Sequence, residues 1–243
     1  MNRLYPRPGE TTPEDLASRL DLGSRAPATR PYVVLNMVAS LDGKAVAEGE
    51  TKSLSAPADR ALFHHLRTQA DAVLVGAGTA KIERYGRATK SDELREKRAD
   101  EGLEPEPLMV IVSGRLTLPS DLPVLQEPDA RVVIATGADR ALEGVAARVE
   151  YMRTGDDLPL MLARLREEHG VRSVLCEGGP MLNSFLLAAG VVDELFLCVS
   201  AQIVGGATGL TIVTGRELLE PSRAELQWLC EAEGDLYSRW RLR

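Results

Sequence analysis

Two neighbouring glycines between an acid and a proline form the first candidate site for chemistry in this sequence. In LCEGGPMLNSFLLAAG, Glu177, Gly178, Gly179 and Pro180 follow an apolar run and precede a helical pattern. Glycines leave backbone N–H groups uncovered, and proline suits the first turn of a helix, where its missing N–H is not needed. Such a helix start favours an anionic group, for which the phosphates of a nucleotide are the best candidate. A tight strand-to-helix turn explains this stretch equally well.

A second glycine-bearing turn follows an apolar run in DAVLVGAGTAK. Gly76, Gly78 and Thr79 come directly off this expected strand, where a nucleotide could approach the backbone. The stretch is not a dinucleotide fingerprint of the doubly wound kind, because Lys81 occupies the third glycine position and no suitable acid-bearing strand follows. Alone it is better explained as a structural turn. Two glycine-rich strand ends in one sheet strengthen the case, since ligands collect at the C-terminal ends of parallel strands.

Charged and hydroxyl side chains gather in three further stretches. Ser40, Asp42 and Lys44 end a strand in one short turn, which is either an Asp-Gly turn between strands or a loop that lines a substrate pocket. Arg67, near the end of an expected helix, is either solvated or a phosphate clamp. In VSGRLTLP, Ser113 and the arginine two residues later suit a 2′-phosphate, and an ordinary turn fits them equally.

Composition limits the class of function. The 243 residues suffice for one large domain, with 44% hydrophobic and 27% charged residues. The net charge of −7 and the 4% of aromatic residues argue against nucleic-acid and anionic-membrane surfaces. Three widely spaced cysteines in apolar runs predict buried, reduced thiols, and the three histidines lack metal-ligand spacing. Without a signal-peptide core or a membrane-spanning run, we expect a cytoplasmic protein with no structural metal.

Short β-rich runs alternate with helical ones from residue 31 onward. The middle runs are continuously apolar, as strands buried on both faces should be, while DLYSRWRL (235–242) alternates as a half-exposed antiparallel edge strand would. Apolar spacing predicts helices over 57–68, 157–169 and 180–189. The expected strands are YVVLNMV, DAVLVG, LMVIV, RVVIA, VEYM, RSVLC, ELFLCVS, AELQWLC and DLYSRWRL.

The chain reads as one α/β domain over residues 31–243, preceded by an extension over 1–30. The extension carries one short helix signal, in which Thr12 caps and Pro13 takes the first turn. The charged segment 83–107 predicts a surface excursion with a frayed helix. Strands that alternate with helices, and a closing pair of adjacent strands, predict a mostly parallel sheet with an antiparallel edge.

Three ordered motifs together resemble the reductase domain of the riboflavin-biosynthesis deaminase–reductases. They are VASLDGKAV, LRTQADAVLVGAGT and EGGPMLNSFLLAAGVVDELFLCVSAQIVGG, and the likeness runs from about residue 31 to the C-terminus. The resemblance implies a dihydrofolate-reductase-like three-layer α/β/α fold around a mixed sheet, NADPH as hydride donor and a homodimer. The implied reaction reduces the ribosylamino group of a 5-amino-6-(phosphoribosylamino)pyrimidinedione to a ribitylamino group. The zinc-binding deaminase motifs have no counterpart in this sequence, so we expect reduction only.

The resemblance also places the ligands on this chain. It implies cofactor contacts along Val38, Ser53, Gly76, Gly78, Thr79, Ser113, Gly178, Gly179, Pro180, Met181 and Leu182. The expected substrate contacts are Ser40, Lys44, Thr51, Arg67, Arg87 and Glu177, with the two arginines holding phosphate. We expect a proton donor among Asp42, Glu83 and Glu177, which are the acids of the matching loops.

One loop departs from the family pattern. After Gly-x-Gly-Thr the family continues with two acids, a proline and a Leu-Thr-x-Arg run, whereas this chain reads AKIERYGRATK and keeps only Glu83. Tyr85 and Arg87 take over the region, so the substrate remains open. The alternatives are an NADPH reductase of the same fold for another heterocycle, such as dihydrofolate, and a non-catalytic nucleotide-binding protein. The polar residues retained in the other loops favour an enzyme.

Overall fold

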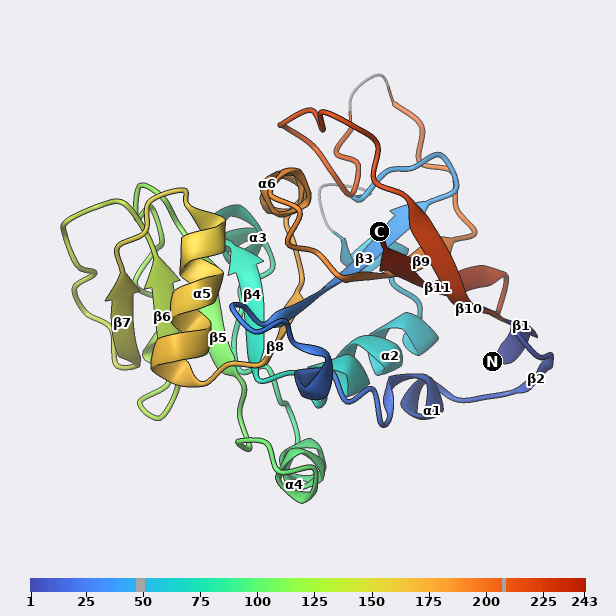
Figure 1. The fold of residues 1–243 in the computed structure, drawn as a ribbon, viewed down its shortest axis with the longest axis horizontal. Helices are drawn as coiled ribbons and strands as arrows, with labels where there is room; N and C mark the ends of the chain where they lie inside the picture. The colour runs from blue at the N-terminus through green and yellow to red at the C-terminus, as the bar shows by residue number, and fades with distance from the viewer. Residues whose placement is uncertain (47–50, 207–208) are drawn as a thin grey trace. The chain divides into compact units, whose positions relative to one another are not determined.

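The computed structural model of the protein describes residues 1–46, 51–206 and 209–243. The chain forms two compact units (Figure 1). Unit 1 combines Met1–Leu20, Val33–Leu66 and Glu177–Arg243, and unit 2 combines Asp21–Tyr32 and Arg67–Cys176. Residues 1–30 therefore contribute to both units.

Strands and helices alternate along the chain as the apolar runs predict. The strands are β1 (Asn2–Tyr5), β2 (Gly9–Glu10), β3 (Tyr32–Ser40), β4 (Ala72–Gly76), β5 (Leu108–Val112), β6 (Arg131–Ala135), β7 (Arg148–Met152), β8 (Ser173–Cys176), β9 (Glu194–Ser200), β10 (Ala224–Ala232) and β11 (Asp235–Leu242). The helices are α1 (Pro13–Ala17), α2 (Pro57–Arg67), α3 (Ala77–Ile82), α4 (Asp92–Asp100), α5 (Leu158–His169) and α6 (Pro180–Ala188). Short 3-10 turns cover Gly23–Arg25, Lys52–Leu54 and Pro123–Gln126. Every strand expected from residue 31 onward is present, with small shifts at the ends.

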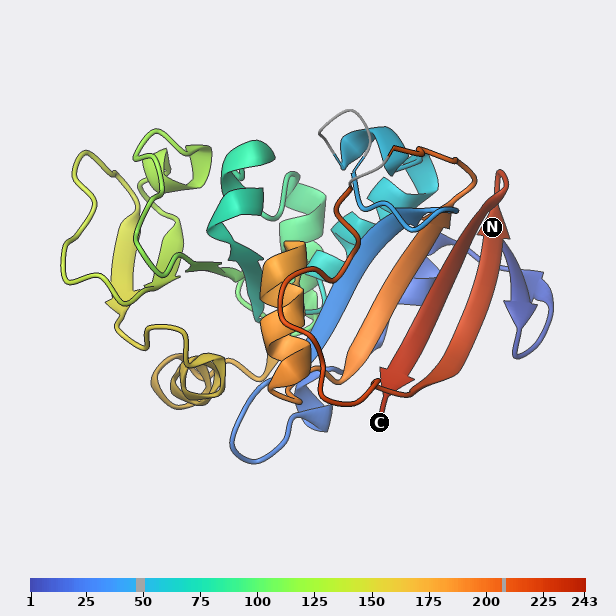
Figure 2. The ribbon, with the colours of Figure 1, turned by 90° about the horizontal axis from the view of Figure 1, so that it is seen from above.

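Unit 2 is built on parallel strands. Strand β4 pairs with β8 on one side and with β5 on the other, and β6 and β7 follow. Because successive side chains point to opposite faces, Val73, Ile111 and Ile134 share one buried face, where Ala80 of α3 also packs. Helix α5 covers the other face (Figures 1 and 2) with its buried apolar stripe.

Unit 1 carries the antiparallel part of the fold (Figure 2). Strand β3 runs parallel to β9, and antiparallel β11, β10, β1 and β2 follow in that order. The expectation that DLYSRWRL forms the edge is wrong, because β11 lies between β10 and β9. Its alternation reflects one covered and one open face, with Tyr237 buried and Leu236 exposed. The N-terminal residues extend the sheet instead, since β1 pairs with β10.

The charged segment after α3 contains the helix expected there, α4, but this helix is anchored and not frayed. Ser91 caps α4, and Arg98 near its end is fully buried. The Arg98 guanidinium donates to the backbone carbonyls of Arg67, Ala70 and Glu104 at 2.5–2.7 Å. Burial lowers the pKa of this guanidinium to about 10, so it remains protonated at neutral pH. A single buried arginine in a charged run leaves no apolar periodicity that would reveal its position.

The expected fold class is confirmed: the chain is α/β, with a mixed sheet whose antiparallel strands come mainly from the C-terminal part. The predicted start of the N-terminal helix is confirmed at α1. There Thr12 and Asp15 cap the helix reciprocally with two 3.0 Å hydrogen bonds. The three cysteines are free and buried, as predicted. Among the described residues, every helix falls short of the length and apolar character needed to cross a membrane.

Candidate functional site

The candidate residues divide between the two units, and each group is described within its own unit. Unit 1 holds Val38, Ser40, Asp42, Lys44, Thr51, Ser53 and residues 177–182. Unit 2 holds Arg67, Gly76, Gly78, Thr79, Glu83, Arg87 and Ser113. Residues 47–50, within the expected pocket loop, lie outside the described residues.

The turn after β3 is a closed hydrogen-bond network. The Ser40 hydroxyl donates to Asp42 Oδ1 at 2.6 Å and accepts from the Lys44 amide at 2.9 Å. Backbone bonds of 2.8 and 2.9 Å join Ser40 to Lys44 and Gly43. Gly43 adopts a φ of 80°, a conformation that favours glycine. These bonds fix the Ser40 and Asp42 side chains and the Lys44 backbone in one arrangement.

Asp42 anchors a second loop to this turn. Its carboxylate accepts from the backbone N–H groups of Val204 at 3.1 Å and Gly205 at 2.7 Å, in the segment after β9. The hydrogen bond from Ser40, followed by the two backbone bonds, lowers the pKa of the carboxyl to about 2. At neutral pH Asp42 is an ionised acceptor and holds no proton to donate. It is therefore a loop anchor and a poor choice among the three expected acids.

Lys44 presents a cation in the same unit. Its half-buried side chain makes no hydrogen bond or ion pair within the part of the chain that the structure describes. A Cβ built on Gly209 would lie 2.8 Å from Lys44 Cδ and 3.0 Å from its Nζ. Glycine at position 209 thus leaves the room that Lys44 occupies. Among the described residues, no acidic side chain pairs with the ammonium group.

Helix α6 begins without a side-chain cap. Gly179 is the N-cap residue, Pro180 takes the first turn, and no described side chain accepts from the first N–H groups. Gly178 has a φ of 84° and a cis peptide bond to Gly179, and a Cβ on Gly178 would meet Met37 Sδ at 3.4 Å. The positive φ at Gly178 favours glycine at this position. The uncapped helix start has the donors that an anion needs.

The flanks of the α6 start differ in exposure. Glu177 and Leu182 are buried, whereas Met181 is 62% exposed. Val38 on β3 is also buried, while Ser53 is exposed and Thr51 half-buried. Of these residues, Met181 and Ser53 are the most exposed.

Asn183 holds the start of α6 in place, and sequence reasoning missed it. Its fully buried amide donates to the Ile212 carbonyl at 2.8 Å and to Met37 Sδ at 3.2 Å. The Thr214 amide donates to the Pro180 carbonyl at 3.1 Å, so the segment around 212–214 lies along this helix. An asparagine in a mostly apolar helical run was the available signal, because a buried amide needs partners.

The glycine turn of unit 2 is open. Strand β4 ends at Gly76, which directly starts α3 without a side-chain cap in the described structure. Gly78 is exposed, and a Cβ built there would meet nothing within 4 Å. The Thr79 carbonyl accepts from the Glu83 amide at 2.9 Å, which closes the short helix. A ligand can approach the backbone at Gly78, although the backbone conformation does not itself require glycine.

Ser113 closes the turn that follows β5. Its side chain is 3% exposed, and its hydroxyl accepts from the Thr117 amide at 3.2 Å. Its own amide donates to the Ala135 carbonyl at 2.9 Å. These contacts support the turn interpretation; a phosphate contact stays a prediction.

Arg67 supports the loop that departs from the family pattern. Its guanidinium is 5% exposed, donates to the Ala88 carbonyl at 3.0 Å and lies 5.7 Å from the Tyr85 ring centroid. On the other side, Glu106 accepts from the amides of Ala88 at 2.6 Å and Thr89 at 3.2 Å. The peptide at Ala88 is thus held from both of its polar groups. Arg67 therefore holds this loop in place through its hydrogen bond to Ala88. A contact between Arg67 and substrate phosphate stays a prediction.

Arg87 is occupied by two carboxylates. Its guanidinium donates to Glu127 at 2.8 and 3.1 Å and to both oxygens of Asp129. The bonds from Asp129 and Glu127 raise the pKa of the guanidinium above its usual range. With both neighbours negatively charged, Arg87 is poorly suited to the phosphate role expected from its position.

Comparison with known proteins gives a consistent set of relatives. A family model described as the RibD C-terminal domain matches residues 31–234. The chain is 34% identical over 202 residues to a 2,5-diamino-6-ribosylamino-4(3H)-pyrimidinone 5′-phosphate reductase of Archaeoglobus fulgidus, covering 81% of this chain and 92% of that relative. It is 30% identical to the riboflavin biosynthesis protein RibD of Bacillus amyloliquefaciens, of which it spans about half, 49%.

Solved structures share the fold. A pyrimidine reductase-like protein from Corynebacterium diphtheriae matches with a TM-score of 0.78 and 23% identity, over 96% of this chain and 99% of that one. The riboflavin biosynthesis reductase Rib7 of Saccharomyces cerevisiae matches with a TM-score of 0.62 and 20% identity, over 89% of this chain and 92% of that one.

Proposed function

Because the chain belongs to the RibD C-terminal domain family, we propose that it is an NADPH-dependent reductase of a phosphoribosylaminopyrimidine in riboflavin biosynthesis. The proposed substrate is 2,5-diamino-6-ribosylamino-4(3H)-pyrimidinone 5′-phosphate. The observation that carries this choice is the 34% identity to a reductase named for that compound, of which the chain covers 92%. The deaminated 5-amino-6-(phosphoribosylamino)uracil is the second candidate, because the motifs also resemble the two-domain deaminase–reductases.

The residues fit a cofactor that carries phosphate. In unit 1, the uncapped N–H groups that start α6 suit a phosphate, and in unit 2 the open backbone at Gly78 leaves room for a close approach. Gly179 and Gly78 are therefore the cofactor contacts that we weight most. When bound, NADPH supplies the hydride that reduces C1′ of the ring-opened ribosylamine.

The chain's own residues bind and orient the substrate. Lys44 holds substrate phosphate through a charge-assisted contact, and Asp42 fixes its loop against the segment after β9. Arg67 shapes the loop at Ala88. The substrate nitrogen must gain a proton during reduction, and we assign that proton to Glu177, a buried acid beside the glycine turn.

The proposal also includes a homodimeric state and a cytoplasmic location. Met181 and Phe185 lie four residues apart on α6 and are 62% and 37% exposed, so they present one apolar stripe. This stripe supports a homodimer, which sedimentation of the chain and of a Phe185→Glu variant would test. The three free, buried cysteines support a reducing, cytoplasmic location.

A substrate panel tests the proposed activity. NADPH oxidation should occur with the diamino compound, more slowly with the deaminated compound, and not with dihydrofolate. The product should gain two hydrogen atoms by mass spectrometry. Turnover of dihydrofolate alone would overturn the substrate assignment, and absence of NADPH oxidation with all three would favour a non-catalytic nucleotide-binding protein.

The contact between Gly209 and Lys44 tests the substrate-binding role. Gly209→Ala places a methyl group 2.8 Å from Lys44 Cδ, so the flexible lysine must move. We expect several-fold higher KM for the substrate, with unchanged melting temperature and unchanged KM for NADPH. Gly9→Ala, at another exposed glycine with open space around its Cβ position, is the matched control.

A double-mutant cycle completes that test. If Gly209→Ala acts through Lys44, it should add nothing to the defect of Lys44→Ala. Independent, multiplying effects of the two substitutions would remove Lys44 from the substrate site.

A further inference from the structure

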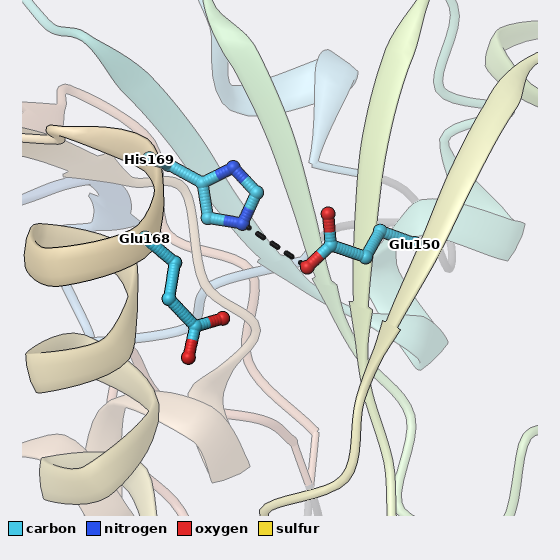
Figure 3. A group of neighbouring side chains, drawn as sticks. All are labelled: Glu150, Glu168 and His169. Atoms are coloured by element: carbon cyan, nitrogen blue, oxygen red, sulfur yellow. Dashed lines mark ion pairs between the residues drawn. The ribbon is translucent and has the colours of Figure 1, made fainter.

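Three side chains with metal-binding donors meet at the edge strand of unit 2 (Figure 3). Glu150 lies on β7, the last strand of that unit's sheet, and Glu168 and His169 end α5. One donor atom from each residue lies within 4.8 Å of the other two. These residues belong neither to the glycine turns nor to the polar loops described above.

The imidazole of His169 supplies the observation that points to a ligand. Its side chain is only 11% exposed, and among the described residues its enclosed Nε2 atom faces the Glu150 carboxylate without making a hydrogen bond. Figure 3 shows this nitrogen directed at the Glu150 carboxylate, 3.3 Å from Oε1. An enclosed nitrogen that makes no hydrogen bond is costly, and a cation held between it and the carboxylate would satisfy both groups.

The spacing of the two donors matches a metal site. Donors bound to Zn²⁺ at about 2.0–2.1 Å in tetrahedral geometry lie about 3.3 Å from each other. The separation between His169 Nε2 and Glu150 Oε1 equals this edge. Glu168 is farther away, but its exposed side chain on the last turn of α5 can rotate toward the pair.

The guanidinium of Arg164 would compete with a metal ion for the Glu168 carboxylate. Arg164, one turn earlier on α5, donates to both oxygens of Glu168 at 2.6 and 3.0 Å. Its positive charge also attracts the Glu150 carboxylate. A metal ion must therefore share or replace this arginine, which predicts that removing Arg164 strengthens metal binding.

We propose that Glu150, Glu168 and His169 bind a divalent transition-metal ion, preferably Zn²⁺. One nitrogen and two carboxylate donors suit Zn²⁺, whereas Mg²⁺ and Ca²⁺ require oxygen donors throughout. The bound ion links β7, an edge strand, to the C-terminal end of α5. It is a structural site, because it clamps two elements and needs no substrate.

Calorimetric titration of the untagged full chain with ZnCl₂, after treatment with a chelator, tests the proposal. We expect one ion per chain. Glu150→Gln and His169→Gln should each weaken binding by about tenfold or more, since even outer-sphere partners cost 10–100-fold. Glu167→Gln, an exposed neighbour on the same helix, is the matched control and should bind as the parent does.

Two further arms separate this site from general surface binding. Arg164→Gln should tighten Zn²⁺ binding several-fold, and MgCl₂ should give no comparable heat. Zn²⁺ should raise the melting temperature of the parent and of Glu167→Gln, but not that of Glu150→Gln or His169→Gln, whose metal-free melting temperatures report their folding. Equal Zn²⁺ affinity in all variants, or no binding by the parent, would overturn the proposal. Neither readout depends on reductase activity.

Discussion

A negative charge at the start of α6 should remove cofactor binding while the fold persists. Gly179 is the N-cap of this helix, with φ −82° and ψ −173°, which is extended backbone open to any residue. Aspartate is among the preferred N-cap residues, because its carboxylate accepts from the first N–H groups. In Gly179→Asp that carboxylate occupies the donors that we assign to phosphate, and it repels the phosphate as well.

The magnitude follows from the contact that is lost. A hydrogen bond to a charged group contributes about 1.5–3 kcal/mol. At about 1.4 kcal/mol per factor of ten, loss of one such bond weakens the NADPH Kd about 10- to 150-fold. Capping and the helix dipole together change the free energy of unfolding by only about 0.3–1 kcal/mol.

The assay is calorimetric titration of NADPH into the variant, with urea unfolding as the measure of stability. Gly179→Asn keeps the size and capping ability of the side chain without its charge, so it should lose less affinity than Gly179→Asp. Gly9→Asp adds the same charge at an exposed glycine on β2 and should bind normally. Unchanged affinity in Gly179→Asp, or equal losses in the aspartate and asparagine variants, would refute the electrostatic argument.

Three other substitutions test separate parts of the account. Gly78→Ala should weaken NADPH binding measured by calorimetry, yet stabilise α3 by about 0.5–1 kcal/mol, and an unaltered Kd would show that no ligand approaches there. Asp42→Asn should lower the melting temperature at neutral pH. The pKa of Asp42 falls from 3.8 to about 2 on folding. The difference in melting temperature between variant and parent should therefore disappear as the pH drops through that interval. A difference that persists at the lowest pH, or that Asp139→Asn reproduces, would contradict the loop-anchor role. Arg98→Ala should lower the free energy of unfolding in urea by about 3 kcal/mol or more, because it leaves three carbonyls unpaired. The control Glu96→Ala should leave this free energy nearly unchanged. A loss below about 1 kcal/mol in Arg98→Ala would contradict the anchoring of α4.

Local pattern was enough to predict most elements of this fold. Continuous apolar runs between turn residues identified the strands, and Pro180 and the paired glycines identified the start of α6. Strand order was harder, because pairing depends on partners far away in the chain. The placement of β11 between β10 and β9, which keeps it from the edge, and the pairing of β1 with β10 have no signal in these stretches alone.

Candidate residues were found by chemical type and by the family resemblance, whereas their roles depend on neighbours that are distant in sequence. Asp42 has the chemistry of a proton donor, but the amides of Val204 and Gly205 make it an ionised anchor. Arg87 has the chemistry of a phosphate ligand, but Glu127 and Asp129 occupy it. Spacing cannot reveal such partners, because each lies dozens of residues away.

The most direct test of the account follows hydrogen from the cofactor to the substrate. The chain should be incubated with 2,5-diamino-6-ribosylamino-4(3H)-pyrimidinone 5′-phosphate and NADPH that carries deuterium at the transferred C4 position. We predict a ribitylamino product with one deuterium, located at C1′ by NMR. Consumption of the cofactor without deuterium at that carbon, or recovery of unreacted substrate, would contradict the proposed reduction.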